Sequence, residues 1–432
     1  MRDLNERPNE KLIYMWNITG SIANAVLSVV ALMIVTRILD DREADIFSIA
    51  WTIGQLMATI GTFQIRMYQA TDVTGVFRFR QYLIYRIITI GIMLASSSVY
   101  ILVRGYMGEK AGVVLLMCIF RAVDSLADVY EGWFQQKERL DLSGKALTFR
   151  IVIGVLGFGV VLFCTGNLIV ASIILIFAYV ICFFCYDIRY YCRVNIFNDK
   201  KTRCSVGRNW VFRMTIEGFP LFINAFLMMS IMNAPKMVLD VFIAQGKLAQ
   251  GIQTIFNIIF MPASVLNLAY IVFRPLITRM ALVWNERKRR EFLRILLTIL
   301  ASLVVIGGGL LVGSAFLGIP VLSVVYAVDL QDYKNELLII IFGGCIYTFA
   351  AVLDNALVVI RRQYILVLAY IFTYIYIKFS SKVLIELWGV MGAALAYASA
   401  MLVFLIIVTV MFIVNFWHAS KKLQIGESNI VK

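Results

Sequence analysis

The sequence predicts an all-α membrane protein of about twelve transmembrane helices, in two parallel six-helix halves around a central cavity, with both termini cytoplasmic. Three observations lead to this fold class. Hydrophobic residues make up 61% of the 432 residues and charged residues only 15%, against about 25% charged in a soluble domain. Apolar segments long enough to cross a bilayer recur along the chain. Lys and Arg gather in alternate loops between these segments.

Twelve segments approach the roughly 20 mainly apolar residues that a membrane-spanning helix needs. The fourth, seventh and eighth contain more polar residues than the others. The first is long enough to remain as a span rather than to be removed as a signal peptide. The predicted spans are residues 12–36, 44–65, 83–103, 111–134, 147–165, 167–188, 208–234, 241–272, 292–316, 336–360, 362–384 and 387–416.

The positive charges set the orientation. With the N-terminus in the cytoplasm, the inner segments contain 30 Lys and Arg residues and the outer segments nine, while Arg121 lies within a span. The two most basic inner segments, 187–213 and 273–294, contain seven each. Because Lys and Arg concentrate in cytoplasmic loops, both termini are expected inside. The same distribution explains the net charge of +14 without a nucleic-acid partner.

The two halves are predicted as residues 1–200 (spans 1–6) and 201–432 (spans 7–12). The phrase "SIANAVLSVVALMIVTRILD" in the first span has a counterpart, "LFINAFLMMSIMNAPKMVLD", in the seventh. Both carry Asn-Ala from the fourth position and end in Leu-Asp. Asp128 and Asp354 likewise precede the inner ends of spans four and ten. Corresponding spans then run in the same direction, as in parallel repeats; chance similarity between apolar segments is the alternative.

The fourth span, "CIFRAVDSLADVYEGWFQQKER", carries a stripe of polar and charged residues. Arg121, Asp124, Asp128, Glu131 and Gln135 are spaced by three, four, three and four, which places them on one helix face. Charges inside a bilayer are costly, so this face should meet protein or a water-filled cavity. Two interpretations remain open: a cavity lining with functional charges, or ion pairs that only join helices.

Other spans add polar residues at membrane depth, for which hydrogen bonds between helices, snorkelling and static kinks are the alternative explanations. A lone carboxylate such as Asp354 is a candidate for reversible protonation. The predicted substrate contacts are Arg37, Arg121, Asn24, Asn224, Lys236 and Asn257. The predicted coupling or gating residues are Asp124, Asp128, Glu217 and Asp354.

The sequence does not predict an enzyme, a metal site or a cofactor. His418 is the single histidine, which excludes histidine-based triads and metal clusters. Cys182 and Cys185 have a CxxC spacing but lie in an apolar span without a second pair. There is no Walker A motif, and no loop is long enough to hold a catalytic domain.

Three segments carry a resemblance to a known family: "NITGSIANAVLSVVALMIVTRIL", "DVYEGWFQQKERLDLSGKALTFR" and "FRPLITRMALVWNERKRREF". Together with twelve spans in two halves and short loops, they resemble the polysaccharide transporter family, which includes the Wzx-type O-antigen flippases. That family belongs to the superfamily that also contains the MATE antiporters and the lipid II flippase. The resemblance covers nearly the whole chain.

The resemblance implies a flippase of the bacterial cytoplasmic (inner) membrane. Its substrate would be an undecaprenyl-pyrophosphate-linked oligosaccharide, an O-antigen or capsule-type repeat unit, moved by alternating access. A proton or sodium ion is the candidate coupling ion, and membrane lipids, a glycan polymerase and glycosyltransferases are candidate partners. A MATE-like cation or drug antiporter is the main alternative. A membrane-embedded glycan polymerase or ligase and a non-transporting scaffold also remain open.

Overall fold

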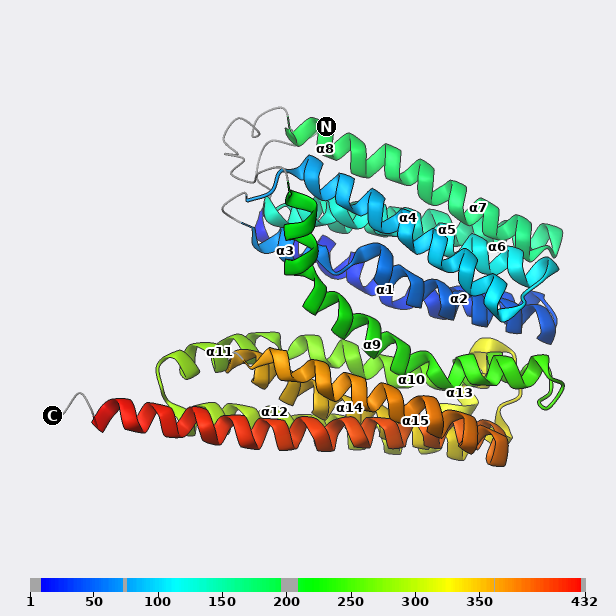
Figure 1. Cartoon of the computed structure of the whole chain (residues 1–432). Helices are drawn as coiled ribbons and strands as arrows, with labels where there is room; N and C mark the ends of the chain where they lie inside the picture. The colour runs from blue at the N-terminus through cyan, green and yellow to red at the C-terminus, as the bar shows by residue number, and fades with distance from the viewer. Residues whose placement is uncertain (1–8, 73–75, 196–208, 361, 429–432) are drawn as a thin grey trace. The chain divides into compact units, whose positions relative to one another are not determined.

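The computed structural model describes residues 9–72, 76–195, 209–360 and 362–428, and every regular element among them is a helix (Figure 1). Residues 196–208 of the basic segment 187–213 lie outside this description. Each of the twelve predicted spans falls on a helix. The prediction of an all-α fold is therefore confirmed.

The described chain forms two compact units, Met1–Met229 and Ser230–Lys432. The boundary lies inside α9 (Trp210–Ala244), whereas the predicted halves assign this helix wholly to the second half. The predicted division and the internal repeat stay predictions. The first unit contains α1 (Glu10–Ile38), α2 (Asp41–Thr62), α3 (Ile65–Thr71), α4 (Phe79–Arg104), α5 (Gly108–Gln136), α6 (Leu140–Thr165), α7 (Leu168–Cys182), the π-helix η1 (Phe183–Ile188) and α8 (Arg189–Asn195).

The second unit begins in α9 and consists mainly of long apolar helices. Two shorter helical turns, Gln331–Tyr333 and Gln363–Ile365, precede α14 and α15. Its remaining elements are α10 (Ile252–Val272), α11 (Arg274–Asn285), α12 (Arg289–Gly313), the π-helix η3 (Ser314–Gly318), α13 (Ile319–Tyr326), α14 (Lys334–Val359) and α15 (Leu366–Ser428).

Eight helical stretches of the described chain are long and apolar enough to cross a membrane. The protein is therefore a multi-pass membrane protein. α2 and α5 are not among the eight, and α10 contributes only a shorter apolar stretch, Ile252–Ala263. The count of twelve spans and the cytoplasmic termini remain predictions. The eight stretches are Glu10–Ile38, Phe79–Arg104, Leu140–Thr165, Leu168–Val194, Trp210–Ala244, Arg289–Tyr326, Gln331–Val359 and Leu366–His418.

One of these stretches, in α15, contains two predicted spans. Gly389 has non-helical torsion angles of φ 55° and ψ −126°, a region that residues with a side chain avoid. A Cβ atom on Gly392 would overlap the carbonyl group of Leu384. The chain therefore folds back at Gly389, and the two arms of α15 lie side by side (orange and red in Figure 1).

In the first unit, α1 and α6 pack closely through two glycines. A Cβ atom on Gly20 would lie 3.0 Å from the Cα atom of Gly144, and one on Gly144 would overlap the carbonyl group of Trp16. Small residues at such crossings let the backbones of membrane helices approach. This contact fixes α1, whose next turn carries Asn24, against the rest of the unit.

Candidate functional site

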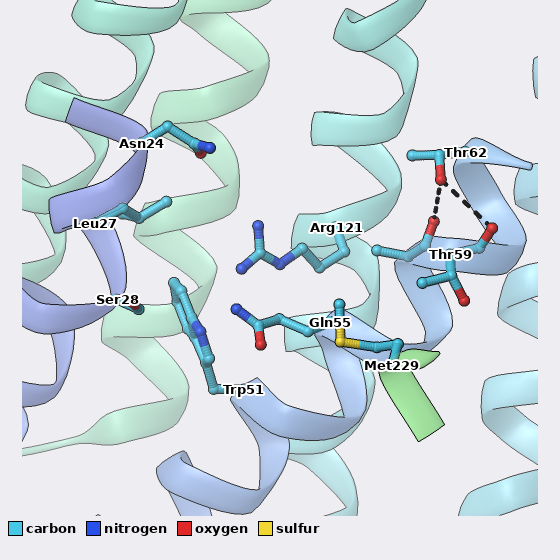
Figure 2. Close-up of a pocket in the computed structure, with 10 residues that line it drawn as sticks. Asn24, Leu27, Ser28, Trp51, Gln55, Thr59, Thr62, Arg121 and Met229 are labelled. Atoms are coloured by element: carbon cyan, nitrogen blue, oxygen red, sulfur yellow. Dashed lines mark hydrogen bonds between the residues drawn. The ribbon is translucent and has the colours of Figure 1, made fainter. Parts of the chain in front are cut away.

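A cavity of about 250 Å³ lies within the first unit (Figure 2). It is bounded by α1, α2, α5 and the last residue of the unit, Met229 in α9. Arg121 is the one charged residue among the described residues that line it. The lining residues are Asn24, Leu27, Ser28, Trp51, Gln55, Ala58, Thr59, Thr62, Arg121 and Met229.

Helical spacing brings these side chains to the cavity. Asn24, Leu27 and Ser28 lie three and four residues apart on α1, and the α2 residues from Trp51 to Thr62 follow the same period. No hydrogen bond joins the Asn24 or Gln55 side chain to another described residue, so both amides are available to a ligand. The Thr59 hydroxyl donates to the Leu56 carbonyl group at 2.6 Å. The Thr62 hydroxyl donates to the Ala58 carbonyl group at 2.9 Å (Figure 2).

Arg121 is held in the cavity by aromatic rings. Its guanidinium carbon lies 4.7 Å from the centroid of the Trp51 ring and 5.0 Å from that of Phe120. A cation over an aromatic face is attracted by the quadrupole of the ring. Figure 2 shows the guanidinium beside the Trp51 ring, directed into the space between Asn24 and Gln55. Gly54 lets α2 lie close to α5 here, since a Cβ atom on Gly54 would lie 3.3 Å from the Met117 carbonyl oxygen.

The carboxylate partner of Arg121 in the described chain is Asp124. Arg121 Nη1 lies 3.4 Å from Asp124 Oδ2, which is longer than the usual 2.7–2.9 Å of a charge-assisted hydrogen bond. The Arg121 side chain is 11% exposed. The Arg121 guanidinium is therefore well oriented in the cavity, but its positive charge is only weakly balanced by Asp124.

The part of the stripe nearer the C-terminal end of α5 is occupied by ion pairs between helices. Arg66 Nη1 lies 3.0 Å from Asp128 Oδ1 and 2.9 Å from Glu131 Oε2. Arg86 Nη2 lies 2.7 Å from Asp128 Oδ2, and Arg86 Nη1 donates to the carbonyl group of Gly61 at 2.8 Å. Burial lowers the pKa of Arg66, but Asp128 and Glu131 outweigh it and leave that pKa raised.

A further buried arginine continues the network. Arg150 Nη1 lies 2.9 Å from Asp187 Oδ2, and Arg150 Nη2 pairs with Glu131 Oε1. The side chains of Arg150 and Asp187 are 1% and 0% exposed. The α5 stripe is therefore divided between a cavity and a set of ion pairs. Arg121 lines a cavity, whereas Asp128 and Glu131 join α5 to α3, α4, α6 and η1.

Sequence reasoning missed four members of this network: Arg66, Arg86, Arg150 and Asp187. The three arginines were counted as charges of the inner loops. The signal for them was the excess of carboxylates on α5, since carboxylates at this depth require cationic partners. Asp187 lies in a π-helix, an element that is often found at functional sites.

Three more predicted residues of the first unit lie outside the cavity lining. Arg37 is exposed in the last turn of α1. Asn224 on α9 has a buried Oδ1 without a hydrogen-bond partner among the described residues. Glu217, also on α9, forms an ion pair with Arg213 at 2.8 Å. The structure thus brings Asn24 and Arg121 together, with Asp124 beside them.

The other three predicted residues belong to the second unit. Lys236 Nζ lies 4.4 Å from the centroid of the Phe260 ring and makes no ion pair with a carboxylate of the described chain. Asn257 on α10 is 7% exposed. Asp354 accepts a hydrogen bond from the Tyr370 hydroxyl at 3.2 Å, and its Oδ1 is buried without a partner among the described residues.

No family model and no curated protein matches the chain. Among solved structures, it is similar to an inward-facing multidrug resistance MATE family transporter of the MOP superfamily, with a TM-score of 0.67 and 14% identity over 92% of this chain and 96% of that chain. For an outward-facing transporter of the same description, the TM-score is 0.63 at 12% identity, over 98% and 99%.

A third similar structure is a MOP superfamily transporter from Pyrococcus furiosus, with a TM-score of 0.56 and 12% identity over 97% of this chain and 98% of that chain. It is described as having a binding pocket of reverse polarity that suggests a different function. At these identities, the similarity concerns the fold. The chain therefore has a MATE-like fold.

Proposed function

We propose that this protein is a flippase that moves an undecaprenyl-pyrophosphate-linked oligosaccharide, of the O-antigen or capsule type, across the bacterial cytoplasmic membrane. The observation that carries the proposal is Arg121, the single charge among the described residues lining the cavity. A cation at this depth matches an anionic head group. Alternating access is supported by the fold, since similar structures are described in inward-facing and outward-facing conformations.

The chemistry of the cavity suits a phosphorylated sugar. A guanidinium group binds phosphate oxygens through two parallel hydrogen bonds and remains charged at every physiological pH. The free amides of Asn24 and Gln55 can donate to and accept from sugar hydroxyls. Without such a site, a charged and hydroxylated head group has no favourable route through hydrocarbon.

The size of the cavity limits what it holds. Its volume of about 250 Å³ is below the roughly 300–1,000 Å³ usual for small-molecule sites. We therefore assign to it one part of the head group, the pyrophosphate with its first sugar. Arg37, Asn224, Lys236 and Asn257 stay proposed contacts for the remaining substrate.

For ion coupling we favour Asp354 over Asp128. Asp354 has a tyrosine hydroxyl as its hydrogen-bond donor, whereas Asp128 is held by two arginines. A carboxylate without a cationic partner is the better candidate to exchange a proton or to bind sodium. Glu217 and Asp124 remain proposed gating residues. A glycan polymerase or glycosyltransferases at the basic inner segments remain proposed partners.

The second candidate function is a MATE-like antiporter for cationic drugs, favoured by the descriptions of the similar structures. Such a protein needs a cavity that attracts cations. The lining of the described cavity, with Arg121 and no carboxylate, is the reason we rank it second. No observation supports membrane-embedded glycan synthesis or a scaffold role. We therefore propose a transporter rather than an enzyme.

Reconstituted vesicles distinguish the two candidates. The purified protein is placed in liposomes with a labelled undecaprenyl-pyrophosphate-linked oligosaccharide in one leaflet, and its appearance in the other leaflet is followed. A parallel set of vesicles carries a cationic dye and a proton or sodium gradient. We expect translocation of the lipid without dye efflux. Dye efflux without lipid translocation would establish the antiporter instead.

A further inference from the structure

Asp124 lies between two arginines in different surroundings. Its Oδ2 is 3.4 Å from Nη1 of Arg121 in the cavity, and its Oδ1 is 3.7 Å from Nη2 of Arg150 in the buried network. Both distances exceed those of a charge-assisted hydrogen bond. Asp124 is thus shared by two cations without a close contact to either one.

The other carboxylates of the network are firmly paired. Asp187 and Glu131 pair closely with Arg150, and Asp128 lies within 3.0 Å of both Arg66 and Arg86. Asp124 is also the most exposed of the four acidic side chains. Its side chain is 29% exposed, against 20%, 5% and 0% for Asp128, Glu131 and Asp187.

A charge balance shows which cation depends on Asp124. Arg150 has Asp187 and Glu131 as close partners, so it depends on Asp124 less than Arg121 does. Within the described chain, the long contact to Asp124 is the one ion pair of Arg121. A partly buried cation without a counter-ion is costly, whereas a tightly bound counter-ion would block the binding of an anion. The long contact satisfies both requirements.

We propose that Asp124 is an exchangeable internal counter-ion, which the pyrophosphate of the substrate displaces from Arg121 and which then moves to Arg150. The inference rests on the proposed function, because it requires an anion in the cavity. A shift of about 1 Å would bring Asp124 Oδ1 from 3.7 Å to hydrogen-bond distance from Arg150. Asp124 thereby sets the affinity of the cavity for anions and connects its occupancy to the buried network.

The test uses inorganic pyrophosphate as the probe and the full chain purified in detergent. Pyrophosphate affinity is measured by calorimetry for the wild type, Asp124→Asn, Asp124→Ser and Arg121→Gln. Removing the Asp124 charge frees Arg121, so both Asp124 variants should bind about tenfold more tightly, which corresponds to about 1.4 kcal/mol. Arg121→Gln should lose binding.

Glu109→Gln is the matched control. It removes one negative charge from the first turn of the same helix, at a residue that forms no ion pair with Arg121 and does not line the cavity. Its pyrophosphate affinity should equal that of the wild type. An equal increase in Glu109→Gln would overturn the inference, because the effect would then follow from overall charge and not from the Arg121 contact.

The outcomes separate the inference from the function on which it rests. If Arg121→Gln loses binding but neither Asp124 variant binds more tightly, the counter-ion inference fails and the anion site stands. If the wild type and both Asp124 variants bind no pyrophosphate while their thermal unfolding remains cooperative, the proposed anion site fails as well. If Asp124→Asn does not fold, the pyrophosphate affinity of Asp124→Ser provides the same comparison with the wild type.

Discussion

At the scale of single residues, the position of Arg121 depends on Trp51. The ring covers the guanidinium at 4.7 Å, and the indole Nε1 is buried without a hydrogen-bond partner among the described residues. The Trp51 ring therefore orients Arg121 through the stacking contact and not through a hydrogen bond. A desolvated cation–π contact is worth up to about 2 kcal/mol.

Replacing Trp51 with Leu should weaken pyrophosphate binding by about tenfold, because Arg121 loses the surface that orients it. Calorimetry on the purified protein measures this change. Phe47→Leu is the matched control, since Phe47 packs on the Trp51 ring at 5.6 Å but does not line the cavity. Phe47→Leu should lower thermal stability and leave the affinity unchanged. Equal weakening in both variants would contradict an orienting role for Trp51.

Arg150→Met should destabilise the first unit by about 3–5 kcal/mol, because Glu131 and Asp187 would stay buried without their cation. Thermal unfolding in detergent measures the loss. The double variant Arg150→Met, Asp187→Asn should recover part of the stability, since one uncompensated charge is removed. A single variant as stable as the wild type would show that the network does not hold α6 and η1 to α5.

The spacing of the α5 stripe predicted one face of charged residues, and the structure places Arg121 on it toward the cavity. The partners could not be predicted in the same way. Arg66, Arg86 and Arg150 come from three other helices, and their pairing depends on tertiary packing that a periodic pattern does not encode. Their neighbours in the sequence are typical of inner loops, so they resembled ordinary cytoplasmic charges.

At the scale of helices, the close glycine contact between α1 and α6 can be tested by a single substitution. Gly144→Ala should destabilise the protein by about 1–3 kcal/mol, because its Cβ would overlap the Trp16 carbonyl group and push the helices apart. Gly91→Ala in α4 is the control, since a Cβ there meets nothing within 4 Å. Gly144→Ala should therefore melt at a clearly lower temperature than Gly91→Ala. Equal values would contradict the close crossing.

The long helices were predictable because apolar segments of bilayer length produce a strong signal. The break near Gly389 was also predicted, between spans that end at residue 384 and start at residue 387. The short helix α3 was not predicted. The turn before it uses Phe63 and Gln64, which both have positive φ angles of 44° and 52°. Without a glycine, the sequence gives no local signal of such a turn.

At the scale of the whole molecule, composition and the period of the apolar segments were enough to predict an all-α membrane protein. The similar structures share this fold across nearly the full chain at 12–14% identity. The fold is therefore compatible with very different sequences, and under the proposed function the charge in the cavity determines which substrate is bound. Eight stretches meet the requirements for a span. The count of twelve also needs the two arms of α15 as separate spans and adds α2, α5 and α10, whose polar residues weaken the hydropathy signal.

The measurement that tests the central claim most directly is lipid translocation by Arg121→Gln in liposomes. Arg104→Gln is the matched control, because Arg104 lies at the end of α4, pairs with the Tyr100 hydroxyl at 2.9 Å and does not line the cavity. We predict that Arg104→Gln moves the labelled lipid-linked oligosaccharide like the wild type, whereas Arg121→Gln is folded and inactive. Translocation by Arg121→Gln at the wild-type rate would contradict an anion site in this cavity.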